Sequence, residues 1–270
     1  WETAPQMALA NNSVCYTDKP DGETFLREWT SLVESKSGER GIFNRISAKE
    51  QAKKFGRRNA DYEFGTNPCS EIILRPYQFC NLTEVVIREK DKFEDLKRKV
   101  MLATILGTAQ ATLTKFPYLR KVWKTNTEEE RLLGVSLTGI MDNELTSGKK
   151  HGLDKTLESL RQIAVETNKE WAAIFGIPQS TAITCVKPSG TVSQLVDSSS
   201  GIHPRHSSYY IRTVRGDNKD PLTNFMIDSG IPSEPDFMKP DTQTVFSFPM
   251  KSPKKSVVRN DMTAIQQLEM

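Results

Sequence analysis

Cysteine and histidine are both scarce in this sequence, with 4 and 3 occurrences among 270 residues. Four cysteines in a chain of this length do not make the disulfide framework of a small secreted domain, so they indicate chemistry or simple burial. The spacing Cys-x-x-Cys does not occur, and with it the paired ligands of a structural zinc site are missing. We therefore predict no metal site and a reducing compartment.

Long apolar runs are missing as well. No stretch approaches the ~18 to 20 continuous apolar residues that a membrane span requires, and residues 1–12 lack the pattern of a signal peptide. The 37 basic and 34 acidic side chains leave a formal charge of +3 that is spread along the chain. Without a block of like charges there is no case for a nucleic-acid or membrane partner. These absences predict a cytoplasmic protein.

Strands and long helices are expected to alternate along the chain, which indicates an α/β fold. Apolar spacing predicts helices over residues 23–34, 47–58, 93–114, 128–141 and 154–175, the last with Asp154 as its N-cap, and a final helix ending at Met270. Extended segments are predicted over residues 182–186, 209–214 and 244–249, with two more between residues 66 and 88. The strand count and the slightly lean apolar content of 37% suggest part of a barrel rather than a whole one.

The densest group of chemically useful side chains is Asn67-Pro-Cys69-Ser-Glu71. If this stretch is extended, Asn67, Cys69 and Glu71 share one face, because side chains alternate along a strand. Pro68 disfavours the middle of a sheet, so we expect a loop or a strand end. Such a cysteine could be a thiolate nucleophile, a metal ligand or a hydrogen-atom abstractor; the first usually needs a histidine base and the second needs paired ligands.

A second candidate site is the turn Lys187-Pro-Ser-Gly-Thr191, which follows the apolar segment 182–186. A short strand, a turn with Gly and hydroxyl residues, and a following helix can direct free backbone N–H groups at an anion. Ser189 and Thr191 add hydroxyl donors, and Gly190 allows a close backbone approach. Alone, this pattern would be a weak signal.

Taken together, these motifs closely resemble those of ribonucleotide reductases, and most of all the monomeric adenosylcobalamin-dependent triphosphate reductases. Asn67-Pro-Cys69-Ser-Glu71 resembles their finger loop, and Cys80 in Gln78-Phe-Cys-Asn-Leu82 lies at the matching distance in the following strand. Three more stretches fit the family in the same order: Ser37-Gly-Glu-Arg-Gly-Ile-Phe-Asn44, Lys187-Pro-Ser-Gly-Thr-Val-Ser-Gln194 and Gly201-Ile-His-Pro-Arg205.

The resemblance implies a role for each matching residue. Cys69 would carry a transient thiyl radical that removes hydrogen from C3′ of the ribose. Glu71 would be the general base on the 3′-hydroxyl, and Asn67 would hold the ribose hydroxyls. Cys80 would be one member of the reducing dithiol pair. The matching turn, Pro188, Ser189, Gly190 and Thr191, would bind the substrate phosphates.

For the whole chain, the resemblance implies part of a ten-stranded α/β barrel with a central finger loop, spanning residues 1–270. The regulatory part before Trp1 and the redox tail after Met270 would be absent. The implied reaction is reduction of ribonucleoside triphosphates with adenosylcobalamin as cofactor and a thioredoxin-like dithiol as reductant, in a protein that is monomeric when complete. A reductase whose radical comes from a separate metal subunit, and an inactive nucleotide-binding remnant, are the alternatives.

Several other residues have a simpler expected role. Cys185 is expected in the core of the segment 182–186, and Cys15 is assigned no function. Tyr209-Tyr210 is expected to pack across strands rather than to transfer a radical. For His203 and His206 a substrate-facing role and an ordinary loop role are equally plausible from the sequence.

Overall fold

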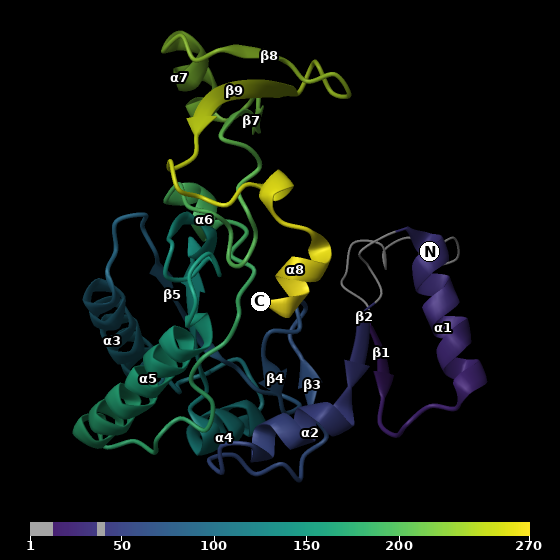
Figure 1. The fold of residues 1–270 in the computed structure, drawn as a ribbon, viewed down its shortest axis with the longest axis vertical. Coiled ribbons are helices and arrows are strands. Elements are labelled where there is room, and N and C mark those ends of the chain that lie inside the picture. The colour runs from purple at the N-terminus through teal and green to yellow at the C-terminus, as the bar shows by residue number, and fades with distance from the viewer. Residues whose placement is uncertain (1–12, 37–40) are drawn as a thin grey trace.

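The computed structural model describes residues 13–36 and 41–270, and it begins with a small parallel unit. Strand β1 (Ser13–Tyr16) pairs in parallel with β2 (Gly41–Asn44), and helix α1 (Gly22–Ser35) lies between them in sequence. This helix confirms the one predicted over residues 23–34. The Asp21 side chain caps it by accepting a hydrogen bond from the N–H of Thr24 at 2.9 Å. The unit lies to one side of the molecule in Figure 1.

The centre of the molecule is a parallel strand pair flanked by helices. Strand β5 (Asn81–Val86) pairs with β6 (Leu133–Thr138), in the register Asn81↔Leu133 through Val86↔Thr138. Residues 182–185 run along the other side of β6, where the N–H of Val135 donates to the carbonyl of Ile183 at 2.8 Å. The predicted strand 182–186 is therefore reduced to a short bridged segment in this position.

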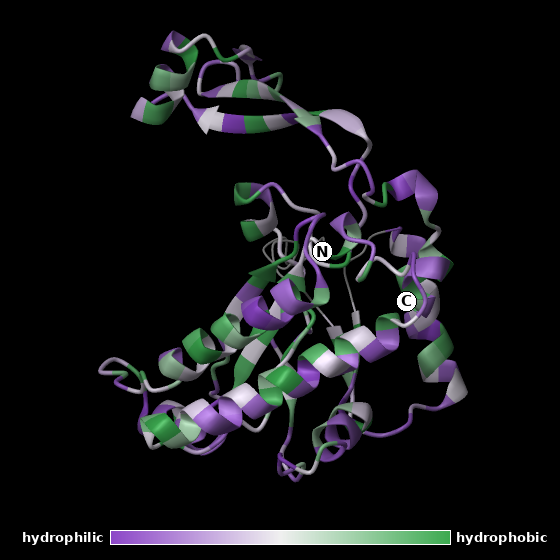
Figure 2. Cartoon of the chain, turned by 60° about the vertical axis from the view of Figure 1, so that its left-hand side comes forward, coloured by the Kyte–Doolittle hydropathy of each residue, from purple (hydrophilic) through white to green (hydrophobic). Residues whose placement is uncertain are grey.

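Two long helices cover this central group of strands. They are α3 (Phe93–Gln110) and α5 (Leu153–Phe175). The two helices pack against each other, and α3 also packs against β5 and β6. Their inward faces join the strands in one apolar cluster that includes Leu96, Val100, Leu133, Leu160 and Ile183. Burying each such side chain stabilises the fold by about 1.5–3 kcal/mol. In Figure 2, apolar and polar residues alternate along the long helix in front.

The other helices and strands between residues 41 and 200 are short. They are helices α2 (Arg45–Lys53) and α4 (Lys121–Glu130), strands β3 (Gly65–Thr66) and β4 (Ile73–Leu74), and the four-residue helix α6 (Val192–Leu195). Helix α2 begins and ends earlier than the predicted helix 47–58.

A three-stranded antiparallel sheet forms the upper part of the molecule in Figure 1. Strand β9 (Gln243–Lys251) lies between β7 (Tyr209–Asp217) and β8 (Ser233–Pro235), and helix α7 (Pro221–Asp228) connects β7 to β8. The sheet confirms the predicted strands 209–214 and 244–249. The chain then ends in helix α8 (Ala264–Glu269).

Three expectations about the fold need correction. The helix predicted over residues 128–141 is wrong beyond Glu130, because Arg131 is in the left-handed conformation (φ 46°) and ends α4 before strand β6. The N-cap of α5 is Gly152 rather than Asp154, which lies in the first turn. In the described ranges the strands form separate sheets of two or three, so the expected barrel is not seen.

No helix of the described ranges combines the length and apolar character that crossing a bilayer would require.

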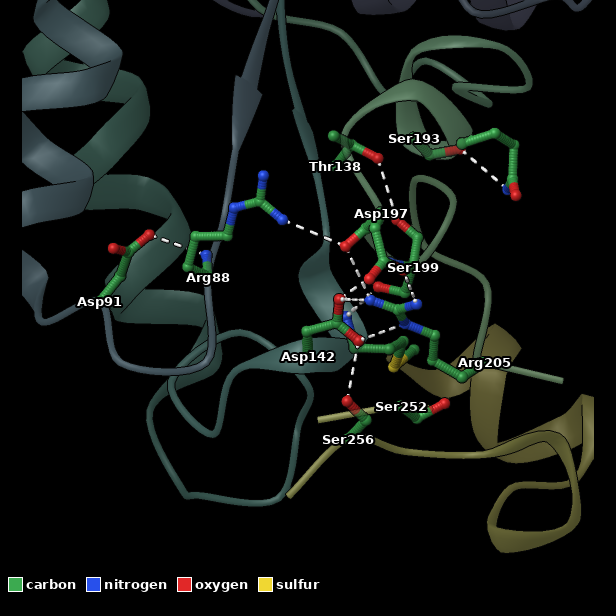
Figure 3. Close-up of polar contacts among 12 residues, drawn as sticks. Arg88, Asp91, Thr138, Asp142, Ser193, Asp197, Ser199, Arg205, Ser252 and Ser256 are labelled. Atoms are coloured by element: carbon green, nitrogen blue, oxygen red, sulfur yellow. Dashed lines mark hydrogen bonds and ion pairs between the residues drawn. The ribbon is translucent and has the colours of Figure 1, made fainter. Parts of the chain in front are cut away.

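A buried ion pair joins the central strands to the C-terminal part (Figure 3). The Arg205 guanidinium donates to both carboxylate oxygens of Asp142, at 2.9 and 2.8 Å, and both side chains are 3% exposed. Asp142 also accepts from the hydroxyl of Ser256 and the N–H of Ser199. Burial alone would lower the pKa of Arg205, but its bonds to Asp142 and Asp197 raise it. Arg205, from the motif Gly201–Arg205, therefore holds three segments together.

Arg205→Met should lower the free energy of unfolding by about 3–5 kcal/mol, because it leaves the Asp142 carboxylate buried without its cation. Urea unfolding followed by circular dichroism measures the change. Arg27→Met is the matched control, since Arg27 forms an exposed pair with Glu23 on α1 and its loss should cost less than about 1 kcal/mol. Equal losses in the two variants would contradict this role of Arg205.

Candidate functional site

Residues 67–71 form a turn between β3 and β4, which we call the finger turn. The two strands pair antiparallel, with Gly65 opposite Leu74 and Thr66 opposite Ile73. The turn is closed by the N–H of Ser70, which donates to the carbonyl of Asn67 at 3.0 Å, and Ser70 has a φ of 61°. The premise of an extended stretch with three side chains on one face is therefore wrong. The expectation of a loop position is correct.

Within the finger turn, the Asn67 and Glu71 side chains point into the structure. The side-chain amide oxygen of Asn67 (Oδ1) accepts a hydrogen bond from the backbone N–H of Ile72 at 3.0 Å. The Glu71 side chain is only 2% exposed, and its Oε1 lies 2.5 Å from Nζ of Lys187. This ion pair connects the finger turn directly to the start of the turn 188–191.

The charge of Glu71 is stabilised by this contact. Burial by itself raises the pKa of the carboxyl, but hydrogen bonds from Lys187, from its own backbone N–H and from Asn67 outweigh burial, so the pKa is lowered. The pKa of Lys187 is raised, chiefly by the same hydrogen bond. Among the described residues, Oε2 of Glu71 is buried and has no hydrogen-bond partner. The site thus contains an ionised carboxylate with one buried oxygen that lacks a hydrogen-bond partner.

Cys69 lies exposed on the finger turn. Its sulfur is near enough to Lys187 to contribute to the raised pKa of that amine. A thiol, an ionised carboxylate and a cation therefore belong to one neighbourhood, with the thiol on the accessible side.

Cys80 and Cys185 approach each other across Gly134 of β6. A β-carbon on Gly134 would lie 3.2 Å from the sulfur of Cys80 and 3.1 Å from that of Cys185, so the bare glycine leaves room for both. Burial, then the charge of Cys185 and Glu71, raises the pKa of Cys80 to about 12. Burial and then Glu71 raise the pKa of Cys185 to about 12. Both groups are therefore protonated at neutral pH.

The turn Pro188–Thr191 is held in place by hydrogen bonds from side chains that follow it in the sequence. Ser189 is buried with a φ of 56°, and its carbonyl accepts hydrogen bonds from the hydroxyls of Ser193 and Ser200. Gly190 and Thr191 are exposed. Within the described ranges, no hydrogen bond is donated by the backbone N–H groups of Ser189, Gly190 and Thr191 or by the Ser189 hydroxyl. The turn therefore presents free donors, although the helix that follows it, α6, has only four residues.

Buried polar groups fix the segment between Glu71 and Cys80. Glu130 accepts two hydrogen bonds from the Arg58 guanidinium, both at 2.9 Å, and one from Gln78 at 2.5 Å. The Arg58 and Glu130 side chains are 5% and 6% exposed. Gln78 in turn accepts from the N–H of Arg75 at 2.9 Å. This network anchors the return of the chain from the finger turn to β5.

The sequence analysis missed four of these residues: Arg58, Gln78 and Glu130 in the anchoring network, and Lys187, which was included in a motif without a role. A lysine directly before the Pro-Ser-Gly turn was an available signal. The anchoring network had no comparable signal, because its members are up to 72 residues apart. Of the Ser37–Asn44 motif, residues 41–44 form strand β2, and residues 37–40 lie outside the described residues.

No family model matches the chain. In structure, it matches a B12-dependent (class II) ribonucleotide reductase with a TM-score of 0.69 and 24% identity, over 95% of this chain and 39% of that one. It also matches the alpha subunit of the class Id ribonucleotide reductase of Actinobacillus ureae, with a TM-score of 0.53 and 18% identity, over 82% and 47%. The fold is that of part of a ribonucleotide reductase catalytic chain.

The sequence comparison is more specific. The chain is 31% identical over 276 residues to the adenosylcobalamin-dependent ribonucleoside-triphosphate reductase of Lactobacillus gasseri, covering 90% of this chain and 35% of that enzyme. The chain is thus a homologue of the class II, adenosylcobalamin-dependent ribonucleoside-triphosphate reductases. It spans about a third of the length of the curated relatives it matches.

The raised pKa values predict that Cys80 and Cys185 react slowly with iodoacetamide at pH 8, because the thiolate is the nucleophile. With a pKa of about 12 instead of 9, the thiolate fraction is roughly 10³-fold smaller. Peptide mass spectrometry after timed labelling should find Cys15 and Cys69, which are exposed, alkylated first. In urea all four should react at similar rates. Labelling of Cys80 in the folded chain as fast as Cys69 would contradict the prediction.

Proposed function

We propose that this chain supplies the catalytic centre of a ribonucleotide reductase that reduces ribonucleoside triphosphates by radical chemistry. One observation carries the proposal: the Lys187–Glu71 ion pair joins the finger turn to the turn 188–191. A carboxylate with a free oxygen and a set of free backbone donors are thereby held next to each other. A ribose between them and a triphosphate on the second turn would satisfy both groups.

Each residue then has one chemical task. A thiyl radical on Cys69 takes the hydrogen atom from C3′, and the unpartnered Oε2 of Glu71 takes the proton of the 3′-hydroxyl. The 2′-hydroxyl leaves as water with a proton that one of the two reducing thiols supplies. Asn67 hydrogen-bonds the ribose hydroxyls. Cys80 is one of two thiols that deliver the electrons. The overall reaction is balanced: one ribonucleotide and two thiols give one deoxyribonucleotide, one disulfide and one water.

The radical on Cys69 requires an external source, and we propose adenosylcobalamin, on which the matching Lactobacillus enzyme depends by its name. When bound, that cofactor supplies the organic radical that oxidises a thiol. The exposed position of Cys69 fits an approach by a large group. Glu71 stays ionised beside the thiol, where Lys187 holds it through the ion pair. The carboxylate takes part in proton transfer and leaves the radical chemistry of the thiol unchanged.

The proposal extends to the partners of the complete protein. A thioredoxin-like dithiol would re-reduce the thiols of the active site, and we expect a monomer in the cytoplasm. A radical source in a separate metal subunit is the rival within the enzyme class, and the likeness of fold to the class Id alpha subunit is the observation in its favour. The other rival, an inactive nucleotide-binding remnant, keeps only the turn 188–191.

Cys69→Ser should abolish reduction of ribonucleoside triphosphates by the complete protein, because a hydroxyl does not readily form or receive the radical that a thiol does. Deoxynucleotide formation with added adenosylcobalamin and a dithiol measures the loss. Cys15→Ser, at an exposed cysteine on β1, is the control and should remain active. Normal turnover by Cys69→Ser would refute the proposal. Nucleotide binding without turnover by the unaltered protein would favour the remnant.

Glu71→Gln should lower turnover by roughly 10² to 10⁴ while nucleotide binding persists, since the amide keeps the shape of the side chain but cannot accept the proton. Steady-state turnover and equilibrium binding of a triphosphate separate the two effects. Glu63→Gln is the matched control, because Glu63 is exposed and pairs with Arg45 and Lys49. Unchanged turnover in Glu71→Gln would mean that the carboxylate takes no part in proton transfer.

A further inference from the structure

The Lys187–Glu71 pair differs from the other lysine–carboxylate pairs of the described residues in one respect. Its carboxylate side chain is 2% exposed, whereas the carboxylates of the other pairs range from 13% to 78%. Lys187 itself is 30% exposed and belongs to a different segment, 116 residues away in sequence. An ion pair between two exposed side chains contributes little to stability. A buried carboxylate, in contrast, depends strongly on the cation that pairs with it.

We propose that Lys187 is a positioning residue for Glu71: it fixes one carboxylate oxygen, keeps the group ionised and directs the other oxygen to the substrate. The inference rests on the proposed function for the role of Glu71 as a base. The ion pair itself does not depend on that function. Lys187 touches the carboxylate and not the reacting atoms.

The geometry limits what else could perform this task. Asn67 contributes to the low pKa of Glu71, but its side chain is a neutral amide and supplies no positive charge. Arg57, Arg58 and Arg161 line a cavity of about 190 Å³ together with Glu71. Arg58 is committed to Glu130. Among the ion pairs of the described residues, Glu71 pairs with Lys187 alone.

Two thiols near Glu71 are themselves affected by its charge. Cys80 and Cys185 are thiols of raised pKa, and Glu71 contributes to that rise in each case. Removing Lys187 would leave a buried carboxylate with burial as its largest influence, and burial raises its pKa. A base works only when ionised, so its activity is lost as the pH falls through its pKa. Lys187 thus extends the active range of Glu71 to lower pH.

The position of Lys187 gives the contact a second consequence. Lys187 directly precedes Pro188, and Gly201 packs against this point, where a β-carbon would lie 2.7 Å from the Lys187 carbonyl oxygen. With a φ of 51°, Gly201 is in the left-handed region, which also disfavours a side chain there. The backbone of Lys187 is therefore fixed against the segment after α6. An anchored backbone lets the lysine hold Glu71 at a constant distance from the turn 188–191.

The test compares Lys187→Met and Lys187→Gln, which remove the charge, with Lys187→Arg, which keeps it. Carbon-13 NMR of glutamate carboxyls, with Glu71→Gln to assign its signal, follows the titration of Glu71 in the 270-residue chain. Both neutral variants should raise the pKa of Glu71, and arginine should restore it. Lys99→Met is the matched control, because Lys99 forms an equally short pair with Asp91 at 2.5 Å, and it should leave the Glu71 titration unchanged.

In the complete protein, the neutral variants should move the acidic limb of the turnover–pH profile to higher pH. Turnover at neutral pH should fall by roughly 10- to 100-fold, the cost of a misplaced catalytic group, with a smaller change in KM. Lys187→Gln retains a hydrogen-bond donor, so it serves where the methionine variant fails to fold. An unmoved Glu71 titration or an unmoved acidic limb would overturn the proposal. A moved titration in a protein that reduces no nucleotide would instead refute the proposed function.

Discussion

The buried pair of Arg58 and Glu130 is the contact on which the position of the candidate site depends most. Glu130 is the last residue of α4, three positions before the start of β6, and Arg58 lies nine positions before the finger turn. Their two hydrogen bonds join segments 72 residues apart, and Arg58 also donates to the carbonyl of Ile73 in β4 at 2.8 Å. Removing either partner would leave a buried charge uncompensated, which costs about 3–5 kcal/mol. The segment that leads from the finger turn to Cys80 is thus fixed by one ion pair and by Gln78.

Local signals in the sequence predicted the three longest helices, but they missed most of α4, all of α7 and strand β6. Helices α1, α3 and α5 have long amphipathic repeats, so their existence follows from spacing alone. Strand β6 was mistaken for helix because Leu133–Thr138 is buried along almost its whole length, which removes the alternation that identifies a strand. The αL residue Arg131, which separates α4 from β6, carries no signal either, since αL is rare outside glycine and asparagine.

For the candidate site, the sequence motifs singled out residues but did not give their arrangement. The motifs located Asn67, Cys69, Glu71, Cys80 and the turn 188–191, but the assumed extended conformation failed at Ser70, whose positive φ closes the turn. The link between the two motifs is a side-chain contact across 116 residues, which no periodicity encodes. Cys185 was predicted to be an ordinary core residue. That prediction did not include its approach to Cys80, which depends on the absence of a side chain at Gly134 on the strand between them.

The protonation states of Cys80 and Cys185 bear on whether a cysteine here could act as a nucleophile, as a metal ligand or in hydrogen-atom transfer. A nucleophile or a metal ligand needs a thiolate, and such cysteines have lowered pKa values. Burial and the charge of Glu71 instead raise the pKa values of Cys80 and Cys185 to about 12, which keeps hydrogen on both sulfurs. A protonated thiol can donate a hydrogen atom, and it does not repel the ionised carboxylate beside it. One buried anion, held by Lys187, would therefore serve the proposed chemistry in two ways: it would accept a proton, and it adds to the burial that keeps hydrogen on the neighbouring thiols.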